Sequence, residues 1–321
     1  MTDDSNQKLG DLVVFVDTPS ATPDAPAAED ATPDAPAAKD APADETSPTP
    51  HPVPLAEAAV NVGDLAVSRG DGIFESIAVI GGRFIALGPH LARLAHSAEL
   101  LELPAPDLAA FERAARAGVD AHTAEPELLV KLVYSRGIEG DGRASGWVQV
   151  LSGANHAEAR GRGIRVVTLD RGYRHDIATT SPWLLQGAKT LSYALNKAAL
   201  REAARRGADD VVFVSSDDVV LEAPTSNVLV RHGDLFRTPR TDLGILAGTT
   251  QAAVFDTLDR LGFETAETVL STAELAAADN IWLLSSGRLV APVRELDGRA
   301  VAVDHELTAK LLDETFGVLA P

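Results

Sequence analysis

The stretch GAKTLSYALNKAAL at residues 187–200 decides how this chain is interpreted. Its apolar residues recur at helical spacing and predict a helix over 194–206. Gly207 follows, and glycine commonly closes a helix because it adopts the left-handed conformation without strain. Lys189 stands just before this helix. Taken alone, a lysine in that place is an ordinary surface residue.

The next stretch, GADDVVFVSSDDVVLEAPTSNVLV at residues 207–230, predicts two strands. Runs rich in valine mark them at 210–215 and 226–231. Glu222 lies between the two strands. By itself it would be a glutamate in the turn at the end of a strand.

Further strands and helices alternate on both sides of this region. Before it, the pattern predicts strands at 12–16, 73–79, 83–87, 127–135 and 146–152, with a glycine turn at 81–82, and helices at 89–102 and 107–122. After 161 it predicts strands at 163–169, 264–270 and 279–284, and helices at 248–262 and 305–317. Short strands alternating with helices predict an α/β (α+β) protein of two domains, a small α+β domain over 53–155 and a larger α/β domain over 161–321, with a cleft between them.

The N-terminal region has a different composition. A short strand is predicted within 1–16, and residues 21–30 then repeat almost unchanged as 31–40. Ten prolines and no aromatic residue lie between Pro19 and Pro54. Such a stretch buries too little apolar surface to offset its ordering entropy, so 17–52 is predicted to be a disordered insertion. It is either a plain spacer or a linker that docks a partner.

Composition and charge exclude several classes of function. The formal net charge is −19, and residues 1–52 hold eleven acids against two lysines. An acidic body repels polyphosphate, so we expect no nucleic-acid partner. The absence of cysteine excludes thiolate nucleophiles, disulfides and Cys-ligated metals. The N-terminus lacks the features of a signal peptide, and no run of 18 apolar residues occurs, so we expect a cytoplasmic protein with no membrane span.

Common catalytic motifs are absent. The chain has no G-x-S-x-G elbow, no phosphate-binding G-x-x-x-x-G-K-[ST] loop and no H-E-x-x-H. The glycine cluster at 140–146 has the wrong spacing for a dinucleotide. His90 and His96 are the only neighbouring histidines, and a spacing of six places them on different helix faces. We therefore predict no metal site.

What remains is a series of short, uncommon clusters in a fixed order. They are RGDGIFES at 69–76, HLARL at 90–94, YSRG at 134–137, the two stretches quoted above, and GILAGTT at 244–250. The series resembles the class-IV aminotransferases, the fold-type IV pyridoxal-phosphate enzymes, over about residues 53–290. The resemblance implies pyridoxal 5′-phosphate as cofactor, held in the cleft between two domains, and a homodimer with residues from the neighbouring subunit near each site.

The resemblance also assigns the residues around the cofactor ring. Lys189, in a K-[TS]-L-[SN] pattern, matches the lysine that binds the cofactor covalently and later moves the substrate proton. Glu222 matches the carboxylate that keeps the ring nitrogen protonated, which the ring needs in order to accept electrons. These two assignments replace the ordinary interpretations given above.

The cofactor phosphate needs a cation and several hydrogen-bond donors. The resemblance assigns Arg93 as the cation, and it assigns the donors Thr225, Gly248, Thr249 and Thr250. The last three open a predicted helix, whose N-terminus favours an anion. The alternatives are a salt bridge of Arg93 along its own helix, with His90 merely packed beside it, and a simple N-cap for Thr249.

The substrate residues follow from the same resemblance. Arg136 in YSRG is expected to bind a substrate carboxylate, although an arginine after a strand can also be merely solvated. At the position of Phe74, the D-amino-acid transaminases that the chain resembles carry a tyrosine. Phenylalanine there removes a hydroxyl near the substrate. Glu75 is either structural or close to the substrate. Gln251 and Pro224 depart from the family pattern around the phosphate.

Two reactions share this set of residues. The closest resemblance is to 4-amino-4-deoxychorismate lyase, which forms 4-aminobenzoate for folate biosynthesis and releases pyruvate. The alternative is a class-IV aminotransferase acting on D-amino acids or branched-chain amino acids. Both act on a small amine that carries a carboxylate. A third possibility is a non-catalytic binding module that kept the fold.

Overall fold

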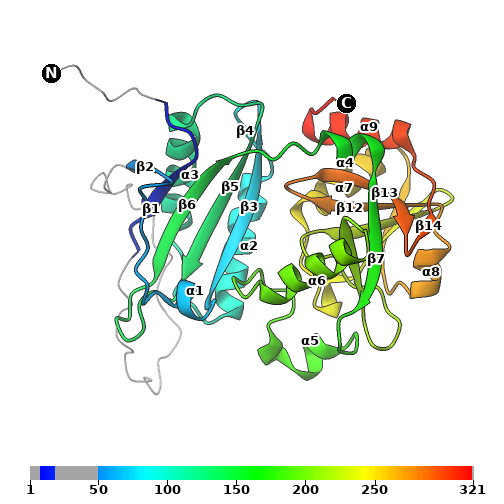
Figure 1. The fold of residues 1–321 in the computed structure, drawn as a ribbon, viewed down its shortest axis with the longest axis horizontal. Helices are drawn as coiled ribbons and strands as arrows, with labels where there is room; N and C mark the ends of the chain where they lie inside the picture. The colour runs from blue at the N-terminus through cyan, green and yellow to red at the C-terminus, as the bar shows by residue number, and fades with distance from the viewer. Residues whose placement is uncertain (1–7, 19–49, 320–321) are drawn as a thin grey trace, which may run out of the picture.

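A computed structural model describes residues 8–18 and 50–319 of the chain. The insertion predicted over 17–52 falls mainly on residues 19–49, which lie outside the described residues. The described chain forms two β-sheets, each with its own helices and its own buried core. Figure 1 shows them side by side, joined by the chain that leaves β6. The fold is therefore mixed α and β, as the sequence predicts, whereas the proposed domain boundaries stay a prediction.

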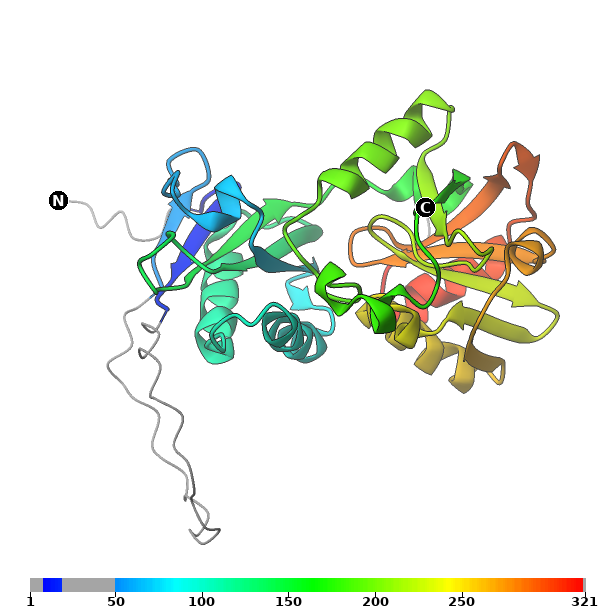
Figure 2. The same ribbon diagram turned by 90° about the horizontal axis from the view of Figure 1, so that it is seen from below.

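The first sheet is antiparallel throughout and has the strand order β2-β1-β6-β5-β3-β4. Its strands are β1 (Leu12–Val16), β2 (Pro52–Pro54), β3 (Gly72–Ile80), β4 (Arg83–Phe84), β5 (Glu127–Ser135) and β6 (Ser145–Ser152). Its helices are α1 (Leu65–Ser68), α2 (Leu87–Leu100) and α3 (Leu108–Ala121). Seen from below in Figure 2, α2 and α3 lie against one face of this sheet.

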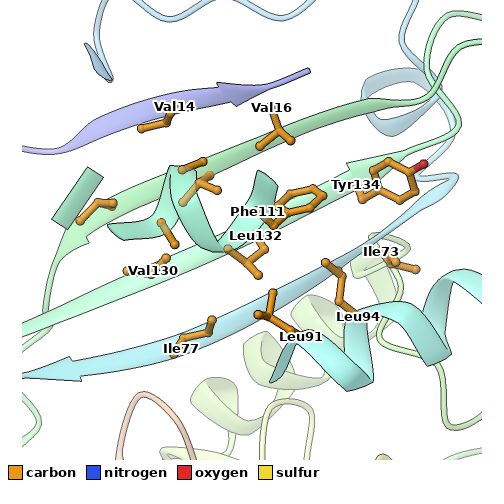
Figure 3. Close-up of a cluster of buried hydrophobic side chains, with 14 of the residues drawn as sticks. Val14, Val16, Ile73, Ile77, Leu91, Leu94, Phe111, Val130, Leu132 and Tyr134 are labelled. Atoms are coloured by element: carbon orange, nitrogen blue, oxygen red, sulfur yellow. The ribbon is translucent and has the colours of Figure 1, made fainter. Parts of the chain in front are cut away.

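The core of the first half lies between that face and the two helices. Leu91 and Leu94 project from α2 toward Ile73 and Ile77 on β3 (Figure 3). A spacing of three along a helix and of two or four along a strand brings such residues to one side. The sheet is thus anchored to α2, the helix that carries the HLARL cluster.

The second sheet is mixed. Its order is β11-β10-β9-β12-β13-β7-β8, with β14 paired to β13, and the β10/β11, β13/β7 and β7/β8 pairs are parallel. The strands are β7 (Ile164–Asp170), β8 (Asp210–Val214), β9 (Asn227–His232), β10 (Leu235–Pro239), β11 (Glu264–Thr268), β12 (Asn280–Ser285), β13 (Leu289–Leu296) and β14 (Arg299–Ala300). The helices are α4 (Ala157–Arg162), α5 (Ile177–Thr180), η1 (Pro182–Leu184), α6 (Ala194–Arg205), η2 (Thr241–Leu243), α7 (Thr249–Arg260), α8 (Thr272–Ala276) and α9 (His305–Phe316).

The segment that carries Lys189 crosses from the second half back to the first. The amide of Phe74 donates to the carbonyl of Lys189 over 3.0 Å, and the amide of Leu191 donates to Gly72 over 2.8 Å. A Cβ on Gly72 would lie 2.8 Å from Leu191 Cδ1, so the close approach of this segment to β3 favours glycine. Just before Lys189, residues 181–188 form η1 and an irregular turn. Lys189 is therefore fixed against the start of β3.

The predicted strand 83–87 was too long. Only Arg83 and Phe84 pair with β3, and α2 begins at Leu87 rather than at Pro89. Ala86 turns the chain with a left-handed conformation, φ 52° and ψ 40°, which ends the hairpin. Within the described ranges, no helix has the length and apolar character that crossing a bilayer requires.

Candidate active site

Lys189 lies where the two halves of the molecule meet. Its backbone amide donates to Ser97 Oγ on α2 over 3.2 Å, and its Nζ lies 4.5 Å from the centroid of the Phe74 ring. The Phe74 ring packs edge-on against Tyr193 with centroids 5.4 Å apart. The amine therefore lies over an aromatic ring, which stabilises a charged ammonium less well than water does.

Burial changes the charge of this amine. Loss of hydration lowers the pKa of Lys189 to about 8, with Arg93 acting in the same direction and the acids Glu75 and Glu222 opposing it. A lysine with such a pKa is partly neutral near physiological pH. Neutral amines are nucleophiles and bases, so the environment of Lys189 suits covalent and proton-transfer chemistry.

Glu222 lies in the loop between β8 and β9 and is only partly exposed. Burial raises its pKa to about 7, opposed by a hydrogen bond from the amide of Leu246 at 3.2 Å and by nearby cations. Glu222 also lines a small pocket together with Arg171 and Tyr173. No ion pair of the described residues neutralises Glu222, so it can accept a cationic group from a ligand.

Arg93, His90 and Glu75 form a buried cluster. Arg93 donates through Nε and Nη2 to the two oxygens of Glu75, each over 2.7 Å, and His90 Nδ1 lies 2.7 Å from Glu75 Oε2. Glu75 is 0% exposed. Burial would raise its pKa, but the hydrogen bonds from Arg93 and His90 outweigh it and lower the pKa to about 2. Of the two roles considered for Glu75, this position favours the structural one.

The N-terminus of α7 lies beside this cluster. Arg93 Nη1 donates to the carbonyl of Ala247 over 2.7 Å, one residue before the N-cap Gly248. The N-cap Gly248 has no side chain with which to cap the helix, and the first N–H groups of a helix have no partner within it. Thr249 Oγ1 lies 3.1 Å from His90 Nε2. The site thus combines a guanidinium, a hydroxyl and uncapped amides, a donor set suited to an anion.

The remaining predicted donors differ in burial. Thr250 is buried in the first turn of α7, whereas Thr225 is exposed in the loop after Glu222. The hydroxyl of the next residue, Ser226, is buried without a hydrogen-bond partner among the described residues. A buried polar atom without a partner often belongs to a ligand site.

Arg136 has its hydrogen-bond partners outside this group. Its guanidinium pairs with Asp71, Nε to Oδ2 at 2.7 Å, and donates to the carbonyls of Leu101 and Glu102 at the end of α2. In the described part of the chain it makes no hydrogen bond or ion pair with Lys189 or Glu222. Its expected role toward a substrate carboxylate stays a prediction.

Four residues of the site were missed by sequence reasoning. They are His90, Ser97, Tyr193 and Ser286, whose Oγ lies 3.5 Å from His90 Nε2. His90 and Tyr193 stand inside quoted clusters, so their proximity to the assigned residues was the available signal. Ser286 follows β12 and has no motif of its own. The described residues contain no group of three or more potential metal ligands.

Comparison with known proteins decides the family. A family model described as amino-transferase class IV matches residues 72–296. The chain belongs to the class IV aminotransferases. It is 43% identical over 267 residues to a bifunctional aminodeoxychorismate lyase / D-amino acid transaminase from Mycobacterium tuberculosis, covering 79% of this chain and 92% of that protein.

Solved structures of class IV aminotransferases agree with this fold. A fold IV-transaminase from Curtobacterium pusillum is 50% identical, with a TM-score of 0.83 over 94% of this chain and 97% of its own. A hypothetical aminotransferase from Mycobacterium tuberculosis in a PLP-bound form is 40% identical, with a TM-score of 0.79 over 83% and 95% of the two chains. Enzymes of this family use pyridoxal 5′-phosphate.

The residues present fit this cofactor. A phosphate dianion suits the uncapped start of α7 beside Arg93. A protonated ring nitrogen suits Glu222, whose carboxylate has no cationic partner within the described ranges and carries a raised pKa. An aldehyde suits the partly neutral amine of Lys189. The three chemical groups of the cofactor thus each find a matching group at one site.

Proposed function

We propose that this class IV aminotransferase is a 4-amino-4-deoxychorismate lyase that forms 4-aminobenzoate and pyruvate. The observation that carries the proposal is the amine of Lys189, which is partly neutral, stacked on Phe74 and flanked by the Arg93 and Glu222 groups. The 43% identical relative bears the names of both a lyase and a transaminase, which supports the lyase activity without excluding the other.

Lys189 is assigned the central chemical role. Bound pyridoxal phosphate supplies an electron-accepting ring that stabilises the negative charge left on a substrate carbon after deprotonation. Lys189 would hold the cofactor and, once released, take the proton from the carbon that bears the substrate nitrogen. Its lowered pKa keeps part of the amine neutral and therefore able to accept that proton.

The other residues hold and tune the cofactor. The cofactor phosphate would be bound by Arg93, Thr225, Gly248, Thr249 and Thr250. Glu75 in turn holds the Arg93 guanidinium in place. Glu222 would keep the ring nitrogen protonated by accepting its hydrogen bond. The loss of the enolpyruvyl group as pyruvate needs no second substrate, because the elements of aminodeoxychorismate equal those of 4-aminobenzoate plus pyruvate.

Lys131 and Lys197 are two cations that could bind a second carboxylate of the substrate. Lys131 on β5 pairs with Ser76 and shares a sheet face with Phe74, because the side chains of alternate residues share a face. Burial lowers the pKa of Lys131, and the nearby Lys197 on α6 lowers it further. Neither lysine forms a salt bridge with any described residue. Aminodeoxychorismate carries two carboxylates, which Arg136 and these lysines could bind.

We further propose that the enzyme is a homodimer. Trp183 on η1 and Leu195 on α6 are 74% and 67% exposed, large apolar side chains of the kind that dimer interfaces bury. They support the homodimer that the family resemblance implies. We also propose that the enzyme acts in the cytoplasm, where chorismate-derived substrates of folate synthesis would be met.

A transaminase acting on D-amino acids or branched-chain amino acids is the second candidate. It is favoured by the second name of the 43% identical relative and by the 50% identical fold IV-transaminase. The same residues would serve it, because both reactions begin with proton removal from the carbon bearing nitrogen.

One assay separates the two. The purified enzyme is mixed with aminodeoxychorismate and no oxo acid, and 4-aminobenzoate and pyruvate are measured. We expect both products in equal amounts. Turnover that requires an added 2-oxo acid would instead establish the transaminase and refute the lyase.

A further inference from the structure

His90 occupies a position between the Glu75–Arg93 pair and the start of α7. It is 1% exposed, on the face of α2 that meets β3. Because the pKa of Glu75 is about 2, its carboxylate is ionised at physiological pH and can only accept hydrogen bonds. The 2.7 Å contact therefore requires a proton on His90 Nδ1. This fixes the tautomer of the neutral ring, with Nε2 as the acceptor.

Nε2 is directed at the hydroxyl of Thr249, in the proposed phosphate site, and at that of Ser286, in the loop after β12. Thr249 Oγ1 lies 3.1 Å away, and Ser286 Oγ lies 3.5 Å away. With a neutral ring, the Thr249 hydroxyl proton points at Nε2 and cannot be donated to an anion. With a protonated ring, Nε2–H donates to the hydroxyl oxygens, and their protons become free for a ligand.

Burial is the main reason that His90 stays neutral when no anion is bound. Burial lowers the pKa of His90, and Arg93 on α2 and Lys189 before α6 lower it further, whereas Glu75 on β3 raises it. The other groups that face the ring, Thr249 on α7 and Ser286 after β12, are uncharged. An added dianion would favour the charged ring.

We propose that His90 is a positioning residue that takes up one proton from solvent when a phosphate monoester dianion binds at the start of α7, and thereby turns the hydroxyls of Thr249 and Ser286 toward the phosphate. The inference rests on the phosphate site proposed above. Glu75 has a defined part in it, since its carboxylate holds the Nδ1–H and so makes Nε2 the nitrogen that titrates.

The test uses the full-length apoprotein and pyridoxine 5′-phosphate, which has no aldehyde and cannot react with Lys189. Near pH 8 the phosphate is already a dianion, because its second pKa is about 6. Calorimetric titrations in two buffers with different heats of ionisation give the number of protons taken up. We expect wild type to take up about one proton more than His90→Gln, which should bind roughly tenfold more weakly because it lacks a charged hydrogen-bond donor.

His96→Gln is the matched control, since His96 lies on the same helix with a side chain 61% exposed. It should behave as wild type. Histidine ¹⁵N spectra of wild type give a second readout that needs no variant, and His90 should change from a neutral Nδ1–H ring to an imidazolium on binding. Binding without that change, or equal proton uptake in His90→Gln, would overturn the role of His90. Absence of binding would overturn the phosphate site as well.

Discussion

At the scale of single residues, the site depends on groups whose charge differs from that in water. Lys189 has a lowered pKa and Glu222 a raised one, and burial is the main cause in both cases. Both pKa shifts reflect buried groups that destabilise the apoprotein. A bound cofactor would offset this cost with a covalent bond to Lys189 and a cationic ring nitrogen beside Glu222. Residues that destabilise the empty protein and complete a ligand site are typical of active sites.

Glu222→Gln tests this cost directly. The folded state of wild type holds a proton on Glu222 up to about pH 7, whereas the unfolded chain releases it near its ordinary pKa of about 4.5. Stability of the wild-type apoprotein therefore falls as pH rises through that window. Above pH 7 the variant apoprotein should be more stable by on the order of 1–2 kcal/mol, as measured by urea unfolding. An equal or lower stability at pH 8 would argue against burial of a charged carboxylate.

Lys131→Met tests the second carboxylate site. Removing one cation from the sheet face that carries Phe74 should raise the KM for aminodeoxychorismate by roughly five- to tenfold, since a partly buried charge pair contributes at least about 1 kcal/mol. Lys310→Met is the control, because Lys310 lies on α9 and pairs only loosely with Glu314 at 3.8 Å. An unchanged KM in Lys131→Met would show that the substrate carboxylates bind elsewhere.

At the scale of elements, sequence patterns located most strands and helices but did not show which of them are in contact. The prediction for 127–135 coincides with β5, and Gly207 follows α6 in a left-handed conformation as expected. The strand β13 escaped prediction because Pro292 interrupts its pattern. The contacts of His90 with Glu75 and with Thr249 join residues 15 and 159 positions apart, so no local pattern could reveal them.

The start of α7 is the element most sensitive to change. A Cβ on Gly248 would lie 2.0 Å from Asn227 Oδ1, and Asn227 also donates to the Leu246 carbonyl over 2.8 Å. Gly248→Ala should therefore displace the helix start, destabilise the protein by about 1–3 kcal/mol and weaken cofactor binding. Gly88→Ala on α2 meets no atom within 4 Å and should be neutral or slightly stabilising. Thermal unfolding and cofactor titration measure both effects.

At the scale of the whole molecule, the site depends on how the two sheets are held together. Arg160 on α4 is 4% exposed and binds both oxygens of Glu127 at the start of β5, at 2.6 and 2.8 Å. It also donates to the carbonyls of Gly287 and Arg288, beside Ser286. One side chain thus joins the first sheet to the loop that borders the proposed phosphate site.

Arg160→Leu should destabilise the protein by roughly 1–3 kcal/mol, because it leaves the partly buried Glu127 and two backbone carbonyls without their donor. Arg162→Leu, two residues later on the same helix, removes an exposed pair with Glu158 at 3.3 Å and should cost less than about 0.5 kcal/mol. Urea unfolding of the two variants provides the comparison. Similar stabilities would show that the link between the sheets does not depend on Arg160.

The most direct measurement concerns Lys189 itself. The purified protein is treated with borohydride, which makes a lysine-bound pyridoxal group permanent, and its peptides are examined by mass spectrometry. We expect the pyridoxyl group on the peptide that contains Lys189, and no yellow colour in Lys189→Ala. A pyridoxyl group on another lysine, or none after incubation with pyridoxal phosphate, would contradict the assignment of this lysine to the cofactor.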